Sequence, residues 1–407
     1  MTTLDLRQGT IFAGDYRVIE PLAHGGMGAV YVAEQVSTGR RRALKVMHPM
    51  LVEDDTARTR FIQEAKVGGL VDSDHVVEVI AAGIDDASRM PWLCMELLVG
   101  ETLQDRISRL HGLPPEELTE VAVQLRHALA RAHHKGLVHR DLKPENIFLE
   151  KPRSSRVPFT VKILDFGIAK LVQQAKGRHA SGTQALGSPL WMAPEQANAQ
   201  PISPATDVWA IGLIAFAALT CRIYWKAAAA GGDLHLTKLL VEILVDPMST
   251  ASERAAELGA AVIPSAGFDR WFARCIAREP ASRHPEAGAC LDALIEVLST
   301  DDVVTRNDAA PAELDRASTS PAIIDSFAKT ATHDETFEPI VHGVVAETRE
   351  PPAAKKQGSM GLGQIAAFLA GSVLVALLAV FGGVAGVSLF QDRAGAGGGD
   401  TPIAIGE

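Results

Sequence analysis

The sequence predicts an α+β fold with two lobes, in which a small strand-rich lobe precedes a larger helical one. Residues 16–96 combine short β-branched runs with a glycine-rich turn, a pattern typical of strands joined by tight turns. Residues 100–298 carry apolar side chains at helical spacing, most clearly at 118–134, 203–219 and 288–298. We therefore expect a ligand cleft between the two lobes.

The composition changes several times along the chain. Asp, Thr, Ala and Pro dominate residues 299–357, where no apolar period is sustained, so we expect a flexible linker there. The predicted segments are an N-terminal arm (1–15), the strand-rich lobe (about 16–96), the helical lobe (about 100–298), the linker (299–357), an apolar helix (362–390) and a short tail (391–407).

Composition and net charge restrict the class of protein. The chain of 407 residues is 47% hydrophobic and 22% charged, which indicates a globular protein rather than a broadly disordered one. A formal net charge of −10 argues against a general nucleic-acid binder, because such a protein needs a basic face. We expect no nucleic-acid partner.

The apolar segment at 362–390 predicts one transmembrane helix. No charged residue occurs from 357 to 390, and this run exceeds the roughly 20 residues that cross a bilayer as a helix. Lys355 and Lys356 precede the run, so the positive-inside rule places the large N-terminal part in the cytoplasm and the short tail outside.

Two other interpretations of this segment stay open. A buried core helix is the alternative to a membrane anchor, although core helices seldom run this long without a charge. Within a membrane, Gly382 and Gly386 form a small-xxx-small pair that can let two helices pack closely, which would make a homodimer; the alternative is a helix that only faces lipid.

The cysteines predict neither a disulfide framework nor a zinc site. They lie far apart and include no CxxC pair, so we expect small buried thiols in a reducing compartment. His133 and His134 end one predicted helix and are expected to be structural. The cysteines are Cys94, Cys221, Cys275 and Cys290.

A glycine-rich hairpin at residues 22–34 is suited to phosphates. The small residues Ala23, Gly25 and Gly28 let the backbone approach a phosphate closely and point N–H groups at it. Val30 then lies where a side chain can cover a flat base. Taken alone, such a hairpin is more often a simple tight turn.

A lysine and a glutamate follow in the order that a phosphate site requires. Ala43 and Lys45 belong to the next predicted strand, and Glu64 lies in a predicted helical stretch at 55–71. A strand lysine held by a helix glutamate can bind the α- and β-phosphates of a nucleotide. Each residue separately reads as a surface charge, but the order behind the hairpin favours the site.

The segment HRDLKPEN, residues 139–146, carries the chemistry of phosphoryl transfer. Asp141 can orient a substrate hydroxyl and accept its proton, and Lys143 can neutralise charge on the moving group. Asn146 offers an amide oxygen to a magnesium ion, and Asp165 in ILDFG offers a carboxylate. Phosphoryl transfer depends mainly on positioning and on charge neutralisation, which these residues supply.

With these motifs in this order, the chain resembles the eukaryotic-type (Hanks-type) serine/threonine protein kinases, and in particular the membrane-anchored bacterial ones. The resemblance covers residues 16–298 and implies a bilobal protein kinase fold that uses ATP and Mg²⁺ on protein substrates. It further implies that Glu195, in Ala-Pro-Glu, pairs with Arg283 and that Asp207 braces the catalytic loop. The LKPEN segment resembles the corresponding segment of kinases that modify serine and threonine.

The resemblance also assigns the nucleotide site. Met95 falls at the gatekeeper position, and the backbone of Glu96 and Leu98 would receive the adenine. The expected nucleotide-binding residues are Leu22, Ala23, Gly25, Gly28, Val30, Ala43, Lys45, Glu64, Met95, Glu96 and Leu98.

Two departures from the family pattern occur. Ala23 replaces the first glycine of the loop, for which we expect slightly altered nucleotide affinity rather than loss of activity. Residues 224–264 do not follow the pattern closely and suggest an unusual helical insertion.

The segment between Asp165 and Glu195 is the expected place of regulation. Arg140 can receive a phosphate carried there, a charge-assisted contact that orders such a loop. Thr183 first, and Ser181 second, are the predicted autophosphorylation sites; the alternative is that both are ordinary polar loop residues.

Two competing functions are weighed against an active protein kinase. A membrane-tethered pseudokinase scaffold would lack one of Lys45, Asp141, Asn146 or Asp165, and all of these are present. A small-molecule kinase of related fold would not need the Ala-Pro-Glu segment or the LKPEN string. We expect a single-pass protein of a bacterial cytoplasmic membrane that acts in signal transduction.

Overall fold

The computed structural model describes residues 6–25, 28–48, 58–59, 61–62, 65, 68–152, 157–166, 189–229, 235–300 and 304–306. All of these belong to one compact unit, Met1–Glu335, of the two into which the chain divides. The predicted transmembrane helix (362–390), most of the linker, the tail and the predicted phosphorylation sites lie outside the described residues. No described helix has both the length and the apolar character that crossing a membrane demands.

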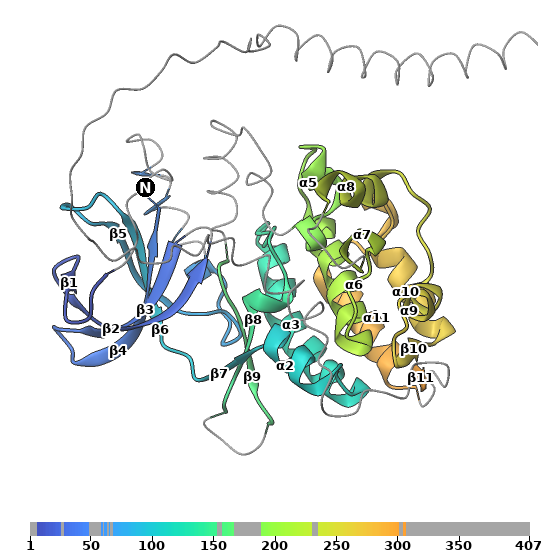
Figure 1. Cartoon of the computed structure of the whole chain (residues 1–407), viewed down its shortest axis with the longest axis horizontal. Coiled ribbons are helices and arrows are strands. Elements are labelled where there is room, and N and C mark those ends of the chain that lie inside the picture. Colours follow the sequence, from blue (N-terminus) through green and yellow to red (C-terminus); the bar gives the residue numbers. More distant parts are fainter. Residues whose placement is uncertain are drawn as a thin grey trace, which may run out of the picture. The chain divides into compact units, whose positions relative to one another are not determined.

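The strand-rich lobe is a six-stranded antiparallel sheet, drawn in blue shades in Figure 1. The order of its strands is β1-β2-β3-β4-β6-β5. Their bounds are β1 (Ile11–Phe12), β2 (Tyr16–Gly25), β3 (Gly28–Gln35), β4 (Arg40–Met47), β5 (Val79–Ile84) and β6 (Pro91–Glu96).

Alternation along β4 places its side chains on opposite faces of the sheet. Leu44 and Val46 are fully buried in one apolar cluster, whereas Ala43 belongs to a second cluster that includes Leu164 of the helical lobe. Lys45 alternates with Leu44 and Val46 and therefore shares the face of Ala43. The period of two thus turns the lysine toward the helical lobe.

Part of the predicted N-terminal arm is built into this lobe. β1 pairs antiparallel with β2, and Phe12 is buried in the same cluster as Leu44. The Leu6 N–H donates to the Tyr31 hydroxyl at 3.0 Å. The folded unit therefore begins before Tyr16.

The predicted helical stretch at 55–71 is described only at some positions. Phe61 and Ala65 have helical backbone and are buried against Met47 and Leu93 of the sheet. The stretch ends in a short 3-10 turn, η2 (Gly68–Leu70). Glu64 lies outside the described residues.

The helical lobe follows, and the prediction of two lobes in an α+β fold is confirmed. Its helices are α2 (Leu103–Leu110), α3 (Pro115–His134), α5 (Pro194–Ala197), α6 (Pro204–Thr220), α7 (Lys226–Ala229), α8 (Leu236–Leu244), α9 (Ala251–Glu257), α10 (Ala266–Cys275) and α11 (Ala287–Leu298). Short 3-10 turns are η3 (Pro144–Asn146), η5 (Pro189–Trp191) and η6 (Pro280–Ser282).

Helix α6 is the centre of this lobe. Every residue from Ala205 to Thr220 is buried, and α3, α10 and α11 pack around it. The helices predicted at 118–134, 203–219 and 288–298 are α3, α6 and α11, whose bounds differ from the prediction by three residues or fewer. α3 and α11 each bury a recurring set of apolar side chains, and α6 is buried along nearly its whole length, so their apolar residues were readable in the sequence.

Residues 224–264, which depart from the family pattern, contain α7, α8 and α9 and end in a short strand, β10 (Val262–Pro264). The flexible linker predicted at 299–357 is wrong at its start. β11 (Val304–Arg306) lies within that range and pairs with β10 in antiparallel register. Backbone hydrogen bonding to β10 holds this short segment, so apolar spacing could not reveal it.

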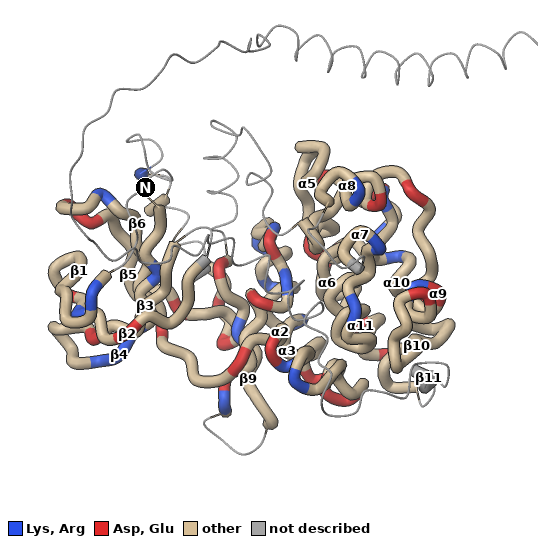
Figure 2. The backbone as a smooth tube through the Cα atoms, viewed as in Figure 1, with Lys and Arg blue, Asp and Glu red and all other residues tan. Residues whose placement is uncertain are grey.

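A third sheet joins the lobes at the cleft. It consists of β7 (Gly100–Thr102), β8 (Ile147–Glu150) and β9 (Thr160–Ile163). The segment before β5 runs beside β9, where Val77 N donates to Ile163 O at 3.0 Å and Ile163 N donates to His75 O at 2.8 Å. Basic and acidic residues occur along both lobes (Figure 2).

Candidate active site

The hairpin of β2 and β3 ends at the predicted phosphate loop. Gly25 is paired with Gly28, and Ala23 is paired with Val30. Gly28 has φ +151°, and a Cβ there would lie 2.1 Å from the Val46 carbonyl oxygen. Gly28 therefore has a steric reason to be glycine. Ala23 lies in β2 without a positive φ, so alanine costs little at that position.

The predicted base-binding residues form one apolar cluster between the lobes. Ala43 and Met95 are buried there, and Val30 and Leu98 are packed against them while partly exposed. Leu22 is 56% exposed and is not among the residues packed in this cluster. The cluster also contains residues that the sequence analysis did not name: Val77, Val79, Leu97 and Leu164. Apolar character alone did not separate them from ordinary core residues.

A narrow cavity lies behind Met95. It is lined by residues of both lobes and reaches Asp165 and Phe166. Met95 borders both the base cluster and this cavity, and its gatekeeper role stays a prediction.

Lys45 meets Asp165 across the cleft. The Lys45 Nζ atom lies 2.7 Å from Oδ1 and 2.6 Å from Oδ2 of Asp165. Burial acts to raise the pKa of Asp165, but the Lys45 ammonium outweighs it, and the pKa lies below 3.8. Asp165 also has φ +57°, a strained backbone for a residue other than glycine. The predicted partner Glu64 lies outside the described residues.

The loop around η3 gathers the predicted catalytic residues. Asn146 Nδ2 donates to the Asp141 carbonyl at 2.8 Å and to its Oδ2 at 3.2 Å, and Lys143 Nζ lies 3.2 Å from the same Oδ2. Because the amide nitrogen of Asn146 is used in this way, its Oδ1 is the atom left for a cation. Leu164 N donates to Asn146 O at 2.8 Å and so joins this loop to the strand end that carries Asp165.

Lys143 remains charged in this loop. Burial acts to lower the pKa of Lys143, but the nearby carboxyl groups of Asp141 and Glu145 outweigh it, and the pKa is raised above 10.5. Burial raises the pKa of Glu145 above 4.5. The loop therefore keeps one fixed positive charge beside the Asp141 carboxylate.

Asp207, at the start of α6, holds the loop from below. Its Oδ2 accepts from the His139 N–H at 2.8 Å and its Oδ1 accepts from the Arg140 N–H at 2.9 Å. Arg140 has φ +71°, so these bonds stabilise a backbone conformation that is otherwise unfavourable. The bracing role predicted for Asp207 agrees with this geometry.

His133 completes the support in a way that the sequence did not reveal. Its Nε2 lies 2.8 Å from Asp207 Oδ2, and its Nδ1 accepts from the Ala287 N–H at 3.0 Å. Since Nδ1 is an acceptor, the proton is on Nε2 and the imidazole donates to Asp207. Its predicted structural role is therefore a specific one, the orientation of Asp207.

The predicted pair of Glu195 and Arg283 is present and fully buried. Arg283 Nη1 and Nη2 each lie 2.8 Å from one oxygen of Glu195, and the two residues are 2% and 1% exposed. Thr206 Oγ1 donates to the same carboxylate at 2.8 Å. This pair anchors α5, the element that closes the segment after Asp165.

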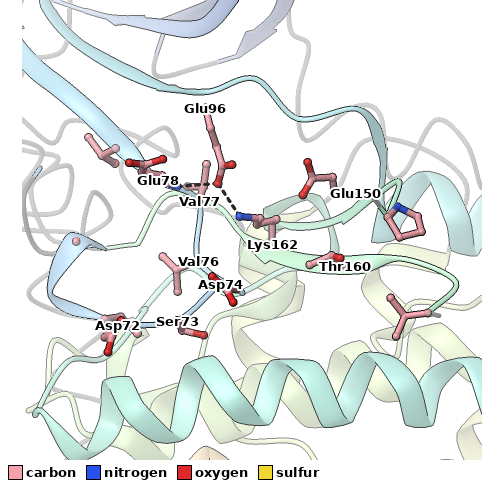
Figure 3. Close-up of a pocket in the computed structure, with 15 residues that line it drawn as sticks. Asp72, Ser73, Asp74, Val76, Val77, Glu78, Glu96, Glu150, Thr160 and Lys162 are labelled. Carbon is pink, nitrogen blue, oxygen red and sulfur yellow. Dashed lines mark hydrogen bonds and ion pairs between the residues drawn. The ribbon is translucent and has the colours of Figure 1, made fainter. Parts of the chain in front are cut away.

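A separate acidic pocket lies beside the hinge between the lobes (Figure 3). Glu96 Oε1 accepts from Lys162 at 2.7 Å and from the Glu78 N–H at 3.0 Å. Of the predicted site residues that the structure describes, only Glu96 lines this pocket. Its carboxylates belong to Asp72, Asp74, Glu78, Glu96 and Glu150.

The structure thus brings together Lys45, Asp141, Lys143, Asn146 and Asp165 at one cleft, beside the base cluster. Ser181 and Thr183 lie outside the described residues, as Glu64 does.

Comparison with known proteins agrees with this geometry. The family model described as "protein kinase domain" matches residues 16–291. The chain is similar to the serine/threonine-protein kinase Pkn1 of Myxococcus xanthus, at 34% identity over 76% of this chain and 42% of that protein. It is similar to PknL of Mycobacterium tuberculosis, at 32% identity over 73% of this chain and 70% of that one.

Solved structures give the same fold. The crystal structure of the Mycobacterium tuberculosis PknI kinase domain covers 72% of this chain and 99% of that domain, with 26% identity and a TM-score of 0.53. The chain spans between a quarter and about half of the length of three Myxococcus xanthus kinases that it matches, 42%, 25% and 55%.

Proposed function

Because this chain belongs to the protein kinase family, with a domain match over residues 16–291, we propose that it transfers the γ-phosphoryl group of ATP to serine and threonine hydroxyls of proteins. Its relatives Pkn1 and PknL are named as serine/threonine-protein kinases. The single observation that carries the proposal is the convergence of Asp141, Lys143 and Asn146 with the Lys45–Asp165 pair.

Each side chain of the site has a separate role in the proposed reaction. The Asp141 carboxylate orients the substrate hydroxyl and takes its proton, and the Lys143 ammonium beside it, 3.2 Å from Oδ2, offsets negative charge on the group in transfer. Lys45 is positioned by Asp165 to hold phosphates beneath the hairpin of Gly25 and Gly28. The apolar cluster around Ala43 and Met95 receives the base.

The oxygen donors of this site suit Mg²⁺. The kinase family uses ATP with divalent metal ions, and the Asn146 Oδ1 and the Asp165 carboxylate are hard oxygen ligands of the kind that Mg²⁺ prefers. When bound, the ion would neutralise phosphate charge. The lowered pKa of Asp165 keeps this carboxylate ionised and ready to bind a cation.

A nucleotide-binding scaffold without transfer activity is the alternative from another class. It is disfavoured because Lys45, Asp141, Asn146 and Asp165 are all present, with Lys45 paired to Asp165 and Asn146 bonded to Asp141. A small-molecule kinase is disfavoured because Glu195, in the segment that closes the loop after Asp165, is anchored by a buried arginine.

We further propose that Thr183 is autophosphorylated, with Ser181 as the second candidate. We also propose that the 362–390 segment anchors the chain in a bacterial cytoplasmic membrane. The apolar run of that segment and the lysines before it support the anchor, and Gly382 with Gly386 supports a homodimer. Phosphopeptide mapping that finds both hydroxyls unmodified in active protein would refute the first proposal. Recovery of the chain in the soluble fraction after cell fractionation would refute the proposal of a membrane anchor.

The direct test is transfer of label from γ-labelled ATP to a generic protein acceptor by the purified full chain. We expect label on serine and threonine after acid hydrolysis, and its loss when EDTA removes Mg²⁺. Protein that binds ATP but labels no hydroxyl would favour the scaffold. Label found only on small molecules would also overturn the proposal.

A further inference from the structure

Two cysteines and a histidine converge in the core of the helical lobe, away from the catalytic loop. Cys275 is the last residue of α10, His284 follows η6, and Cys290 lies in the first turns of α11. One ligand atom from each lies within 4.8 Å of the others. All three side chains are buried, with exposed fractions of 0%, 5% and 0%.

The distance between the sulfur atoms fits shared coordination. Cys275 Sγ and Cys290 Sγ are 3.6 Å apart. A disulfide needs about 2.05 Å, whereas two thiolates on one tetrahedral zinc, with Zn–S near 2.3 Å, lie about 3.8 Å apart. The thiols are therefore spaced as two ligands of one ion rather than as the two halves of a disulfide.

The imidazole supplies an independent observation. His284 is 95% buried by its 5% exposure, yet its Nε2 has no hydrogen-bond partner. A buried polar atom left without a partner costs roughly 1–3 kcal/mol of stability. Coordination of a metal ion by the imidazole ring would remove this cost.

From these observations we propose that Cys275, His284 and Cys290 bind one thiophilic d10 metal ion, Zn²⁺. Two thiolates and a neutral imidazole balance the charge of Zn²⁺, which a buried apolar site requires. Binding releases the two thiol protons to solvent as the two Zn–S bonds form. The described residues supply three ligands, which leaves the fourth tetrahedral position to a ligand other than these three side chains.

The place of the site suggests what the ion does. Arg283, which anchors Glu195, directly precedes His284, and its Nε donates to Ala277 O at 2.7 Å, two residues after Cys275. Gly212 of α6 touches the same spot, because a Cβ there would lie 2.6 Å from Cys275 Cβ. The ion would tie α10, α11 and the connection that carries Arg283 into one unit.

A zinc site was not expected from the sequence, because the spacing of these residues is unusual. The ligands follow the pattern Cys-x8-His-x5-Cys rather than a CxxC pair. Convergence depends on the packing of α10 against α11, which no local motif records.

The test is the metal content of the full chain, purified without chelators from zinc-replete cells and measured by mass spectrometry. We expect about one Zn²⁺ per chain in the wild type and almost none in the double variant Cys275→Ser/Cys290→Ser. The matched control is Cys94→Ser, which removes an equally buried thiol of the strand-rich lobe and keeps the ion.

A second measurement covers the case in which the double variant fails to fold. Wild-type chain grown with Co²⁺ in place of Zn²⁺ is expected to show thiolate-to-cobalt charge-transfer absorption and the intense visible bands of a tetrahedral site. Wild-type protein with no more zinc than the double variant, or cobalt-grown protein without thiolate absorption, would overturn the proposal and leave two core thiols in simple contact.

Discussion

Asp207 is a buried residue on which the geometry of the catalytic loop depends. It accepts hydrogen bonds from two consecutive loop N–H groups and from His133. Burial acts to raise its pKa, but the hydrogen bond from His133 and the other nearby donors outweigh it, and the pKa lies below 3.8. The ionised form is therefore the one that supports the loop.

Replacement Asp207→Asn is expected to lower the free energy of unfolding at neutral pH by about 2 kcal/mol or more, since hydrogen bonds to a charge are lost. A carboxyl group with a depressed folded pKa stabilises the fold above its unfolded pKa, and this contribution is lost as pH falls through the folded pKa. The difference between wild type and variant should thus narrow below about pH 4. Denaturant titrations from neutral to acid pH measure it, and a difference that widens on acidification would contradict this explanation.

At the residue scale, local motifs predicted the catalytic groups, and distant partners stayed hidden. Asp141, Lys143 and Asn146 lie within one short segment, so their joint role was readable from spacing. His133 is 74 residues from Asp207, and nothing in its neighbourhood in the sequence distinguishes it from any histidine at a helix end. Long-range hydrogen bonding of this kind follows only from the packing of the helices.

Helix α5 shows how an element can be fixed by one buried ion pair. The element has only four residues, Pro194–Ala197, too few to be stable by its own backbone hydrogen bonds. Its Glu195 is held by two bonds from Arg283, which lies between η6 and α11. Removal of one partner would leave the other charge buried and unpaired.

Replacement Arg283→Met is expected to lower the free energy of unfolding by about 3–5 kcal/mol. The control is Arg17→Met, which breaks the exposed pair with Glu34 and should cost less than about 1 kcal/mol. Adding Glu195→Gln to Arg283→Met should restore part of the loss, because the unpaired charge is removed. Equal effects of Arg283→Met and Arg17→Met in thermal or denaturant unfolding would contradict the assignment.

Elements were predictable where they were long and periodic. α3, α6 and α11 bury continuous apolar faces and were placed to within three residues. β11 is three residues long and exists through pairing with β10, so the sequence assigned it to the linker. The convergence of α10 and α11 that brings Cys275 to Cys290 escaped prediction for a similar reason, because it is set by tertiary packing.

At the scale of the whole molecule, contacts between the lobes form the site. Lys45 reaches Asp165, His75 Nδ1 lies 3.0 Å from the Val161 carbonyl oxygen, and Lys162 reaches Glu96. All three cross from one lobe to the other beside the base cluster. Asp165 thus lies beside Lys45, and the β9 region bonds to both lobes.

The order of motifs along the chain gave this architecture, whereas the contacts that connect the lobes were only partly predictable. A lysine at a strand position and an aspartate in a short motif predicted one residue on each side of the cleft. The predicted partner of Lys45 is Glu64, and the structure shows an ion pair of Lys45 with Asp165, 120 residues away. The membrane anchor at 362–390 stays a prediction.

The central claim is that Asp141 serves as the acceptor of the substrate proton in phosphoryl transfer. The most direct measurement compares initial rates of label transfer for wild type and Asp141→Asn, with ATP affinity determined on the same samples, and Asp86→Asn as an exposed control. We expect the Asp141 variant to be about 10²–10⁴-fold slower with ATP affinity little changed, and the control to match wild type. An Asp141 variant that transfers label at the wild-type rate would contradict the assignment.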